Sequence, residues 1–356
     1  MLAGHRAGEG IRMKLETFED VEKSIKKNSK RPFHVLLGNG FSVAYAPTIF
    51  SYNALYDFVD KLDDDDLKKI LSVIETKNFE IVMQHLDQFA ALIGAFGGYA
   101  DLKKRVDAAS AKLKSSLLDA VKALHPEHVF KVSEEQSQAC ARFLKTFLGT
   151  GGSIYSTNYD LLLYWVLMRN EVEGHIDGCG RELLNPDEVE KGEEEDWSEL
   201  LWSKHRDRQN VFYLHGALQF FDTGVSIVKE EYDVYNHLLQ KITNRMNGGE
   251  YPIFVTAGDG RQKLTHIRHN RYLTYCFDKL CEAQGSIVTF GFRFGDQDEH
   301  IVDAINAAAR RHPNEKLWSA YIGVYSDSDR EHIEQIAHKF RCKVRIFDAK
   351  TANVWG

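Results

Sequence analysis

The sequence of 356 residues predicts a protein of the α/β class, with a mostly parallel sheet, helices on both faces and a large helical insertion. Three observations support this prediction. The apolar run at 33–37 stops abruptly at a glycine turn, as a short buried strand does. From residue 153 onward, short apolar runs alternate with helical patterns, which is typical of a parallel sheet covered on both faces. Between these parts, residues 51–149 show only helical periodicity and therefore predict an inserted helical layer.

The elements are expected in the following order. Residues 15–29 form an amphipathic helix, which leads into the strand at 33–37. Within the helical segment, helices are expected at 51–62, 65–76, 78–93, 101–124 and 133–149. A strand–helix unit at 153–172 precedes an acidic stretch, including 192–197, that is either an exposed loop or a second insertion. Further strands are expected at 211–216, 251–258, 286–292, 319–325 and 343–349. Further helices are expected at 228–246, 264–283, 298–311 and 328–340.

This order predicts three parts of the chain. Residues 1–30 are an N-terminal arm and helix, and the arm up to Met13, which is a possible alternative start, is expected to be disordered or dispensable. Residues 31–61 and 150–356 together form a Rossmann-like domain. Residues 62–149 form the helical insertion.

Composition excludes several classes of protein. The net charge is −7 and the pI is near 6.1, and no basic patch dominates, so direct binding of nucleic acid is not indicated. The longest apolar run, Leu161 to Met168, is far shorter than the roughly 18 to 20 residues that span a bilayer, so no membrane association is expected. Five scattered cysteines without a Cys-x-x-Cys pair predict a cytoplasmic protein with no four-cysteine zinc site.

Four strand ends carry unusual clusters, and in an open parallel sheet ligands bind beyond the carboxyl ends of the strands. The first cluster is Gly38-Asn39-Gly40-Phe41-Ser42. Its glycines allow the backbone to approach a pyrophosphate, although a plain tight turn explains them equally well. A P-loop is excluded because no Gly-Lys-Ser/Thr follows.

The second cluster is Ser156-Thr157-Asn158-Tyr159-Asp160, where a buried strand changes into a helix. Asp160, taken singly, is best explained as an N-cap that binds amides of the first helical turn. Asn158 fits capping less well because two other capable residues flank it. The cluster therefore contains one polar side chain that a capping role leaves unexplained.

The third and fourth clusters follow later strands. His215, before Gly216, is either a satisfied buried imidazole or an accessible base. In the fourth, Gly291 and Gly295 bracket Arg293, and acidic residues then begin a helix, where they ordinarily complement the helix dipole. A metal site formed by Asp296, Asp298 and His300 is disfavoured, since their spacing matches no known metal motif.

The order of the four clusters resembles the sirtuin-like NAD-binding family over roughly residues 33–60 and 150–325. In that family a Gly-Ala-Gly-x-Ser turn holds the dinucleotide phosphates, a Thr-Gln-Asn-x-Asp segment carries a catalytic asparagine, and a His-Gly pair supplies the general base. The resemblance implies that Asn158 and His215 are catalytic. The residues that it implies bind NAD are Gly38, Asn39, Gly40, Phe41, Ser42, Thr157, Asp160, Gly291, Phe294, Gly295 and Asp296.

The chain also departs from the sirtuin pattern. Asn39 replaces the middle alanine, Thr157 stands where glutamine is usual, and the four zinc cysteines of the protein-deacetylating members are missing. The pattern therefore looks closer to the bacterial sirtuin-like proteins of antiphage defence, which hydrolyse NAD. It also resembles an uncharacterised bacterial family that shares the blocks "LLGNGFS", "STNYDLLLYW" and "YLHGAL". No zinc is expected.

The resemblance implies an NAD glycohydrolase that releases nicotinamide and ADP-ribose and depletes NAD in bacterial antiphage defence by abortive infection. The nicotinamide–ribose bond breaks through an oxocarbenium-like centre. The Asn158 amide would orient a water and the ribose hydroxyls, and a neutral His215 would accept a proton. Two alternatives are a zinc-independent deacylase or ADP-ribosyltransferase, and a non-catalytic assembly module that senses NAD or ADP-ribose.

The resemblance also implies partners. An enzyme that destroys NAD must be silent until infection, so a homo-oligomer is expected. A separately encoded hexameric DNA-translocating ATPase or another phage sensor is a further expected partner. The helices of residues 62–149 are where the assembly surface is expected.

Overall fold

The computed structural model describes residues 13–27, 31–46, 65–74, 79–126, 128–232, 237–255, 259–312 and 315–356. The helix predicted at 51–62 and the arm at residues 1–12 lie outside this described part of the chain.

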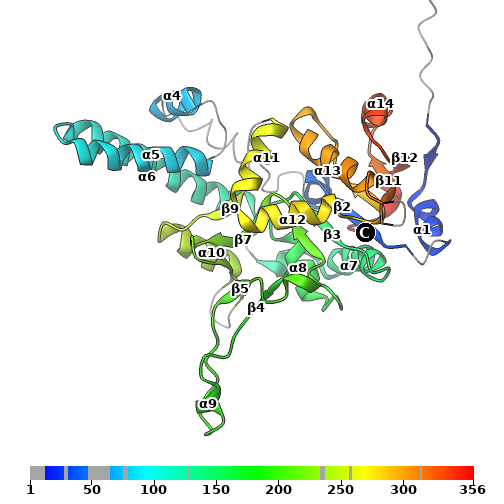
Figure 1. The fold of residues 1–356 in the computed structure, drawn as a ribbon, viewed down its shortest axis with the longest axis horizontal. Coiled ribbons are helices and arrows are strands. Elements are labelled where there is room, and N and C mark those ends of the chain that lie inside the picture. Colours follow the sequence, from blue (N-terminus) through cyan, green and yellow to red (C-terminus); the bar gives the residue numbers. More distant parts are fainter. Residues whose placement is uncertain are drawn as a thin grey trace, which may run out of the picture.

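A seven-stranded parallel sheet forms the centre of the protein (Figure 1). Its strands, in spatial order, are β1 (Leu15–Glu16), β12 (Lys343–Asp348), β11 (Leu317–Val324), β10 (Gly285–Phe290), β2 (Phe33–Leu37), β3 (Ile154–Ser156) and β6 (Val211–Tyr213). From β2 the chain adds β3 and β6 on one side, whereas β10, β11 and β12 are added on the other. The strand order therefore reverses between β2 and β10, which is where open α/β sheets bind their ligands.

Helices cover both faces of this sheet, which confirms the predicted α/β class. The strands β2 and β10 are buried along their whole length, as continuous apolar runs in a parallel sheet require. In Figure 1, α7 (Glu134–Leu148) and α8 (Leu162–Arg169) lie on one side, and α12 (Arg271–Cys281) and α13 (Glu299–Ala309) on the other. The remaining elements near the sheet are α1 (Phe18–Lys27), α2 (Asn39–Tyr45), α14 (Asp327–Ile336), η3 (Asp296–Asp298), η4 (Ala337–Lys339) and η5 (Ala349–Ala352).

The segment predicted as a helical insertion has two different parts. Helices α4 (Asp65–Ile74), α5 (Phe79–Phe96) and α6 (Ala100–Leu124) extend away from the sheet, with α5 and α6 paired as a hairpin (Figure 1). In contrast, α7 contacts β2 and β3 and buries Phe143, Leu144 and Phe147 in the central core. It follows η1 (Val129–Lys131). The helices that stand apart are therefore α4 to α6, and α7 belongs to the layer that covers the sheet.

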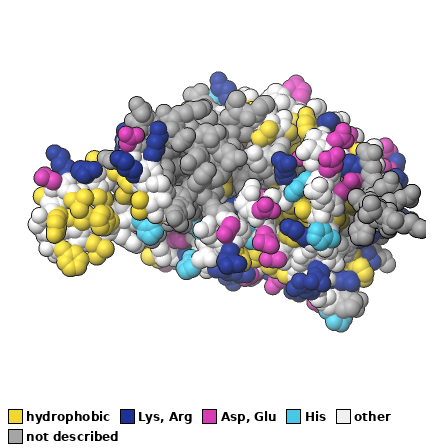
Figure 2. Space-filling model, turned by 90° about the horizontal axis from the view of Figure 1, so that it is seen from above, with side chains coloured by type: hydrophobic (Ala, Val, Ile, Leu, Met, Phe, Trp, Pro, Cys, Tyr) yellow, Lys and Arg dark blue, Asp and Glu magenta, His cyan; other side chains and the backbone are white. Residues whose placement is uncertain are grey.

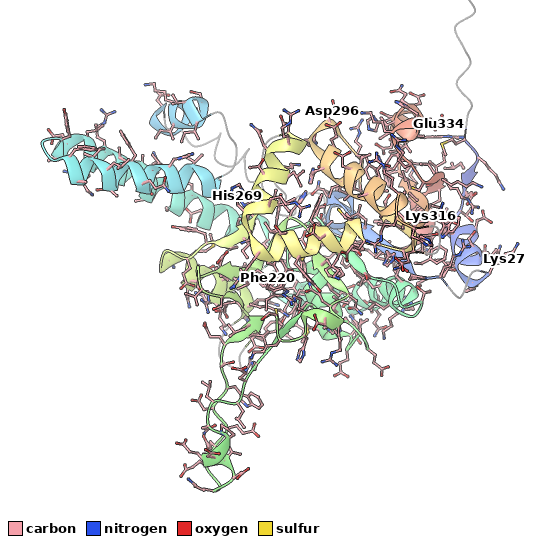
Figure 3. The ribbon with its side chains drawn as sticks, in the orientation of Figure 1. Lys27, Phe220, His269, Asp296, Lys316 and Glu334 are labelled. Atoms are coloured by element: carbon pink, nitrogen blue, oxygen red, sulfur yellow. The ribbon has the colours of Figure 1, made fainter. Side chains whose placement is uncertain are left out.

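A second sheet of five antiparallel strands was not predicted. Its spatial order is β4 (Cys179–Gly180), β5 (Leu200–Trp202), β8 (Ile227–Lys229), β7 (Gly216–Asp222) and β9 (Pro252–Phe254). The strand predicted at 251–258 thus pairs with β7 and not with the parallel sheet. Phe220 of β7, labelled in Figure 3, is fully buried and stacks on Tyr272 of α12 with ring centroids 4.7 Å apart. Both sheets therefore share one core.

Three predicted helices differ clearly from the observed ones. The helix predicted at 15–29 begins only at Phe18, because residues 15–16 form β1. The helix predicted at 228–246 begins only at Leu238, as α10 (Leu238–Asn247), because residues 227–229 form β8. The helix predicted at 264–283 is divided into α11 (Gly260–His269) and α12. Asn270 causes this division, since its side chain accepts hydrogen bonds from the amides of Tyr272 (3.0 Å) and Leu273 (3.1 Å) and so caps a new helix.

The predicted acidic loop is exposed, as expected. It lies in an arm that projects from the second sheet and carries α9 (Pro186–Val189), while η2 (Arg206–Arg208) lies beyond β5 (Figure 1). Among the described residues, none of the helices combines the length and the apolar character that crossing a bilayer requires.

Candidate functional site

The register of the parallel sheet brings the four predicted clusters to one edge. Leu37 at the end of β2 pairs with Ser156 of β3 and with Phe290 of β10. Ser156 in turn pairs with Tyr213 of β6. Asn158 and His215 therefore each lie two residues after a paired strand residue. Each of the two glycine turns begins one residue after the paired residue of its own strand. The clusters occupy neighbouring carboxyl ends on both sides of the strand-order reversal.

The two glycine turns at this edge pack directly against each other. The amide of Gly38 donates to the carbonyl of Phe290 (3.0 Å), and that of Gly40 to the carbonyl of Gly291 (2.8 Å). A β-carbon on Gly38 would lie 2.5 Å from the Gly291 oxygen, and one on Gly40 would lie 2.6 Å from the Gly291 Cα. The glycines are thus needed for close backbone contact, and both amides are already occupied by backbone acceptors.

A hydrogen-bond network joins the first two clusters. The Asn158 side-chain amide donates to the Gly38 carbonyl and to Ser42 Oγ, at 3.0 Å each. Ser42 Oγ donates to Asp160 Oδ2 at 2.5 Å, and Asp160 Oδ1 accepts from the amide of Leu162 at 3.0 Å. Asp160 therefore binds the first amide of α8 from one residue before the N-cap position, which is Leu161, and also fixes Ser42. We call Asn158, Ser42 and Asp160 the Asn–Ser–Asp network.

Burial determines the electrostatics of this network. Burial raises the pKa of Asp160 to about 6, although its hydrogen bonds from Ser42 and Leu162 act in the opposite direction. Ser42 is completely inaccessible, whereas Asn158 is 8% exposed. No donor among the described residues reaches Asn158 Oδ1. The amide oxygen is thus the part of the network left for a ligand hydroxyl or a water.

Two neighbouring residues hold this edge in place. Thr157 continues the pairing of β2 with β3, because its amide donates to the Leu37 carbonyl at 3.0 Å. His125, directly after α6, accepts the amide of Leu161 on Nε2 (2.9 Å), while its Nδ1 donates to the Pro126 carbonyl (2.9 Å). Burial lowers the pKa of His125 to about 4, so the ring is a neutral acceptor at pH 7. This hydrogen bond ties the end of α6 to Leu161, the residue after Asp160.

His215 is buried beside a second histidine. Its Nε2 lies 2.8 Å from Nε2 of His300, in the first turn of α13, and the ring centroids are 5.1 Å apart with the ring planes 23° from parallel. Burial, and then the nearby charges of His300, Lys263 and His266, lowers the pKa of His215 well below its usual range. His215 is therefore a neutral imidazole at pH 7.

The fourth cluster is only partly brought to the site. Gly291 contacts the first glycine turn, as described above. Phe294 packs instead against Phe292 and Phe340, with ring centroids 4.6 and 5.2 Å away. Gly295 precedes η3, and Asp296 is exposed at the upper edge of the molecule in the view of Figure 3. In the described part of the chain, His, Cys, Asp and Glu side chains nowhere form a group of three that could hold a metal ion.

Sequence reasoning missed two residues that contact the site. His300 was considered only as a metal ligand, and His125 was not singled out. Each contacts a segment distant in the chain, 85 residues away for His300 and 36 for His125. Such contacts leave no periodic pattern in the sequence. The one usable signal was the position of His300 in the first turn of an amphipathic helix, beside the Gly-rich turn.

The chain was compared with known protein families and with curated proteins. No curated protein matches the chain. A family described as a domain of unknown function (DUF4917) matches residues 35–355, a range that includes every cluster at the carboxyl edge and the second sheet. Since this match covers far more than half of the sequence, the chain belongs to the DUF4917 family.

Proposed function

We propose that this protein is an NAD glycohydrolase that cleaves the nicotinamide–ribose bond to nicotinamide and ADP-ribose. The Asn–Ser–Asp network is the observation that carries the proposal. It lies at the carboxyl edge of the sheet beside the strand-order reversal, and it holds Asn158 so that its amide oxygen accepts no hydrogen bond from the described residues. The depletion of NAD in antiphage defence rests on the sirtuin-like resemblance.

The chemistry needs little from the protein beyond positioning. The nicotinamide leaves as a neutral molecule from a cationic precursor, so no general acid is required. Asn158 would orient the attacking water or the ribose hydroxyls through its amide oxygen, at no cost of added charge. The buried, neutral His215 would accept the proton that is released. Because the Gly38 and Gly40 amides are occupied, phosphate contacts would come from other groups of the turn, such as Asn39, whose side chain is exposed.

Removal of either catalytic side chain should silence NAD cleavage. We expect Asn158→Ala and His215→Ala to lower the rate of nicotinamide release by at least about 100-fold, the usual contribution of a positioned base or orienting group. The measurement is nicotinamide formation from NAD by the purified protein, with and without a modified protein acceptor. Turnover that requires the acceptor would indicate the deacylase or transferase alternative.

Matched controls separate chemistry from folding. The Asn170 amide also donates hydrogen bonds, to Ser137 Oγ (2.8 Å), the Val166 carbonyl (2.9 Å) and the Ser137 carbonyl (3.4 Å), but it lies at the far end of α8. His34 is a buried histidine bonded on both nitrogens at the amino end of β2. Asn170→Ala and His34→Ala should reduce stability and leave turnover per folded molecule unchanged. Unchanged nicotinamide release by Asn158→Ala would contradict the proposed function.

The α5–α6 hairpin supports self-association. Large apolar side chains are exposed at its outer end, and Figure 2 shows them gathered there. We call this set the hairpin patch: Phe89, Leu92, Phe96, Tyr99 and Leu102. Beside the patch, Lys103 is paired with Asp107 (2.7 Å), and the exposed Asp101 and Lys104 add one charge of each sign, so the surroundings do not favour a partner of one charge. Two copies of the patch would bury on the order of 1,000 Å², which is at the low end for a specific interface. We therefore propose that a second copy of this chain covers it.

Phe96 is 83% exposed and is the best site to test this assembly. Phe96→Glu places a charge in the patch and should shift a concentration-dependent oligomer to the monomer, as measured by light scattering after size-exclusion chromatography. Val225, equally exposed at the turn between β7 and β8, provides the control Val225→Glu, which should leave the oligomer intact. A wild-type protein that is monomeric at every concentration would rule out this use of the patch.

A further inference from the structure

The contact between His215 and His300 leaves one nitrogen without a partner. His300 is 2% exposed and lies between His215 and Phe277 of α12, whose ring is 14° from parallel to its own. Its Nε2 is used in the contact with His215, but its Nδ1 is buried and has no hydrogen-bond partner in the described part of the chain. A buried nitrogen without a hydrogen-bond partner has a free-energy cost, so its presence here calls for an explanation.

The direction of the bond between the two imidazoles decides whether His215 can act as a base. Burial lowers the pKa of both rings, to about 3 for His300, so each carries a single proton at pH 7. If His300 donates, His215 holds its own proton on Nδ1 and has no free lone pair. If His215 donates through Nε2, its Nδ1 is a free acceptor. Only the second arrangement makes His215 a general base.

We propose that His300 is a positioning residue that accepts the Nε2 proton of His215 and thereby keeps His215 Nδ1 free to take a proton from the substrate or from water. This inference rests on the proposed role of His215. The proton of His300 is then on its unpartnered Nδ1. The arrangement follows the general pattern in which a third group fixes the tautomer of a catalytic base, with a neutral imidazole in place of the usual carboxylate.

The charges around the pair keep both rings neutral, which the proposed arrangement requires. Lys263 of α11, which is paired with Asp298 at 3.1 Å, lowers the pKa of both histidines, and His266 of α11 also lowers that of His215. The start of α11 packs on the start of α13, because a β-carbon on Gly260 would lie 3.1 Å from the His300 amide nitrogen. The Lys263 charge opposes a cation on either histidine, so the hydrogen bond between them joins two neutral imidazoles.

The first test does not depend on NAD. Nitrogen-15 NMR of the wild-type protein without ligand reports which imidazole nitrogens carry protons. We expect an unprotonated Nδ1 on His215 and a protonated Nδ1 on His300, with signals assigned by their loss in His215→Gln and His300→Gln. The reverse pattern overturns the proposal, whatever the protein does to NAD.

The second test is kinetic. His300→Phe keeps the ring beside Phe277 and removes the acceptor, so kcat for NAD cleavage should fall by about 10- to 100-fold with little change in KM. His300→Gln restores a carbonyl acceptor near the position of Nε2, and kcat should recover to within about threefold of the wild type. Equal kcat for the Phe and Gln variants overturns the positioning role. Absence of NAD cleavage by the wild type refutes the proposed function instead, and the NMR result still decides the tautomer.

Discussion

Replacement of Gly291 by alanine is expected to lower the free energy of unfolding by roughly 3 kcal/mol or more. Gly291 has a φ of +66°, where a β-carbon is disfavoured. The added carbon would also lie 2.4 Å from the Gly40 carbonyl carbon and 2.4 Å from the Phe41 amide nitrogen. Both atoms are backbone, so no side chain can rotate away. Denaturant unfolding followed by circular dichroism measures the loss.

Gly151→Ala is the matched control. Gly151 has a similar φ of +73°, but a β-carbon there meets nothing within 4 Å. Its replacement isolates the conformational part of the effect, about 1 to 2 kcal/mol. If Gly291→Ala costs no more than Gly151→Ala, the two glycine turns are not packed as described. NAD cleavage per folded molecule should also fall in Gly291→Ala. The packing of Gly291 on the first glycine turn positions the Gly38 carbonyl, which accepts a hydrogen bond from Asn158.

The second large effect is a pH-dependent change in stability at Asp160. Burial raises the pKa of Asp160 from its ordinary value of 3.8 to about 6, so the folded protein binds this proton more tightly than the unfolded chain. The stability that the protonated form contributes is fully present below about pH 4. It is lost as the pH rises to about 6, and the total corresponds to about 3 kcal/mol.

Asp160→Asn removes this titration and keeps the shape of the side chain. Relative to the variant, the wild type should lose about 3 kcal/mol of stability between pH 4 and pH 7. Taking the difference between the two proteins cancels the titration of other groups, such as the buried histidines. Asp101→Asn on the exposed surface of α6 controls for the loss of one negative charge. A constant difference between wild type and Asp160→Asn across this range would show that Asp160 is not protonated in the folded protein.

Much of the parallel sheet could be predicted because its strands are continuous apolar runs between turns. The run at 33–37 is an example, since it is buried at every position and ends at a glycine. The antiparallel sheet could not be predicted in the same way. Its strand β7 begins immediately at Gly216, whose φ of +82° turns the chain, so the sequence shows one apolar stretch interrupted by a single glycine. The partners of β7 are set by tertiary contacts.

The candidate site could be predicted in position but not in detail. The strand ends identified Asn158, Asp160 and the glycine turn, because polar residues at the end of a buried strand are conspicuous. That Ser42 bonds both Asn158 and Asp160 depends on the register of two strands, which the sequence does not state. The sequence also could not show that Phe294, which the resemblance assigns to the NAD site, packs in the core instead.

The bond between His125 and Leu161 determines where the chain can be shortened. A deletion of the α5–α6 hairpin would remove helices that project away from the central sheet (Figure 1). The start of α8, however, depends on His125, which directly follows the last residue of α6. A minimal version of this protein must therefore rejoin the chain upstream of His125 and keep its imidazole, or the helix that follows Asp160 begins with an unbound amide.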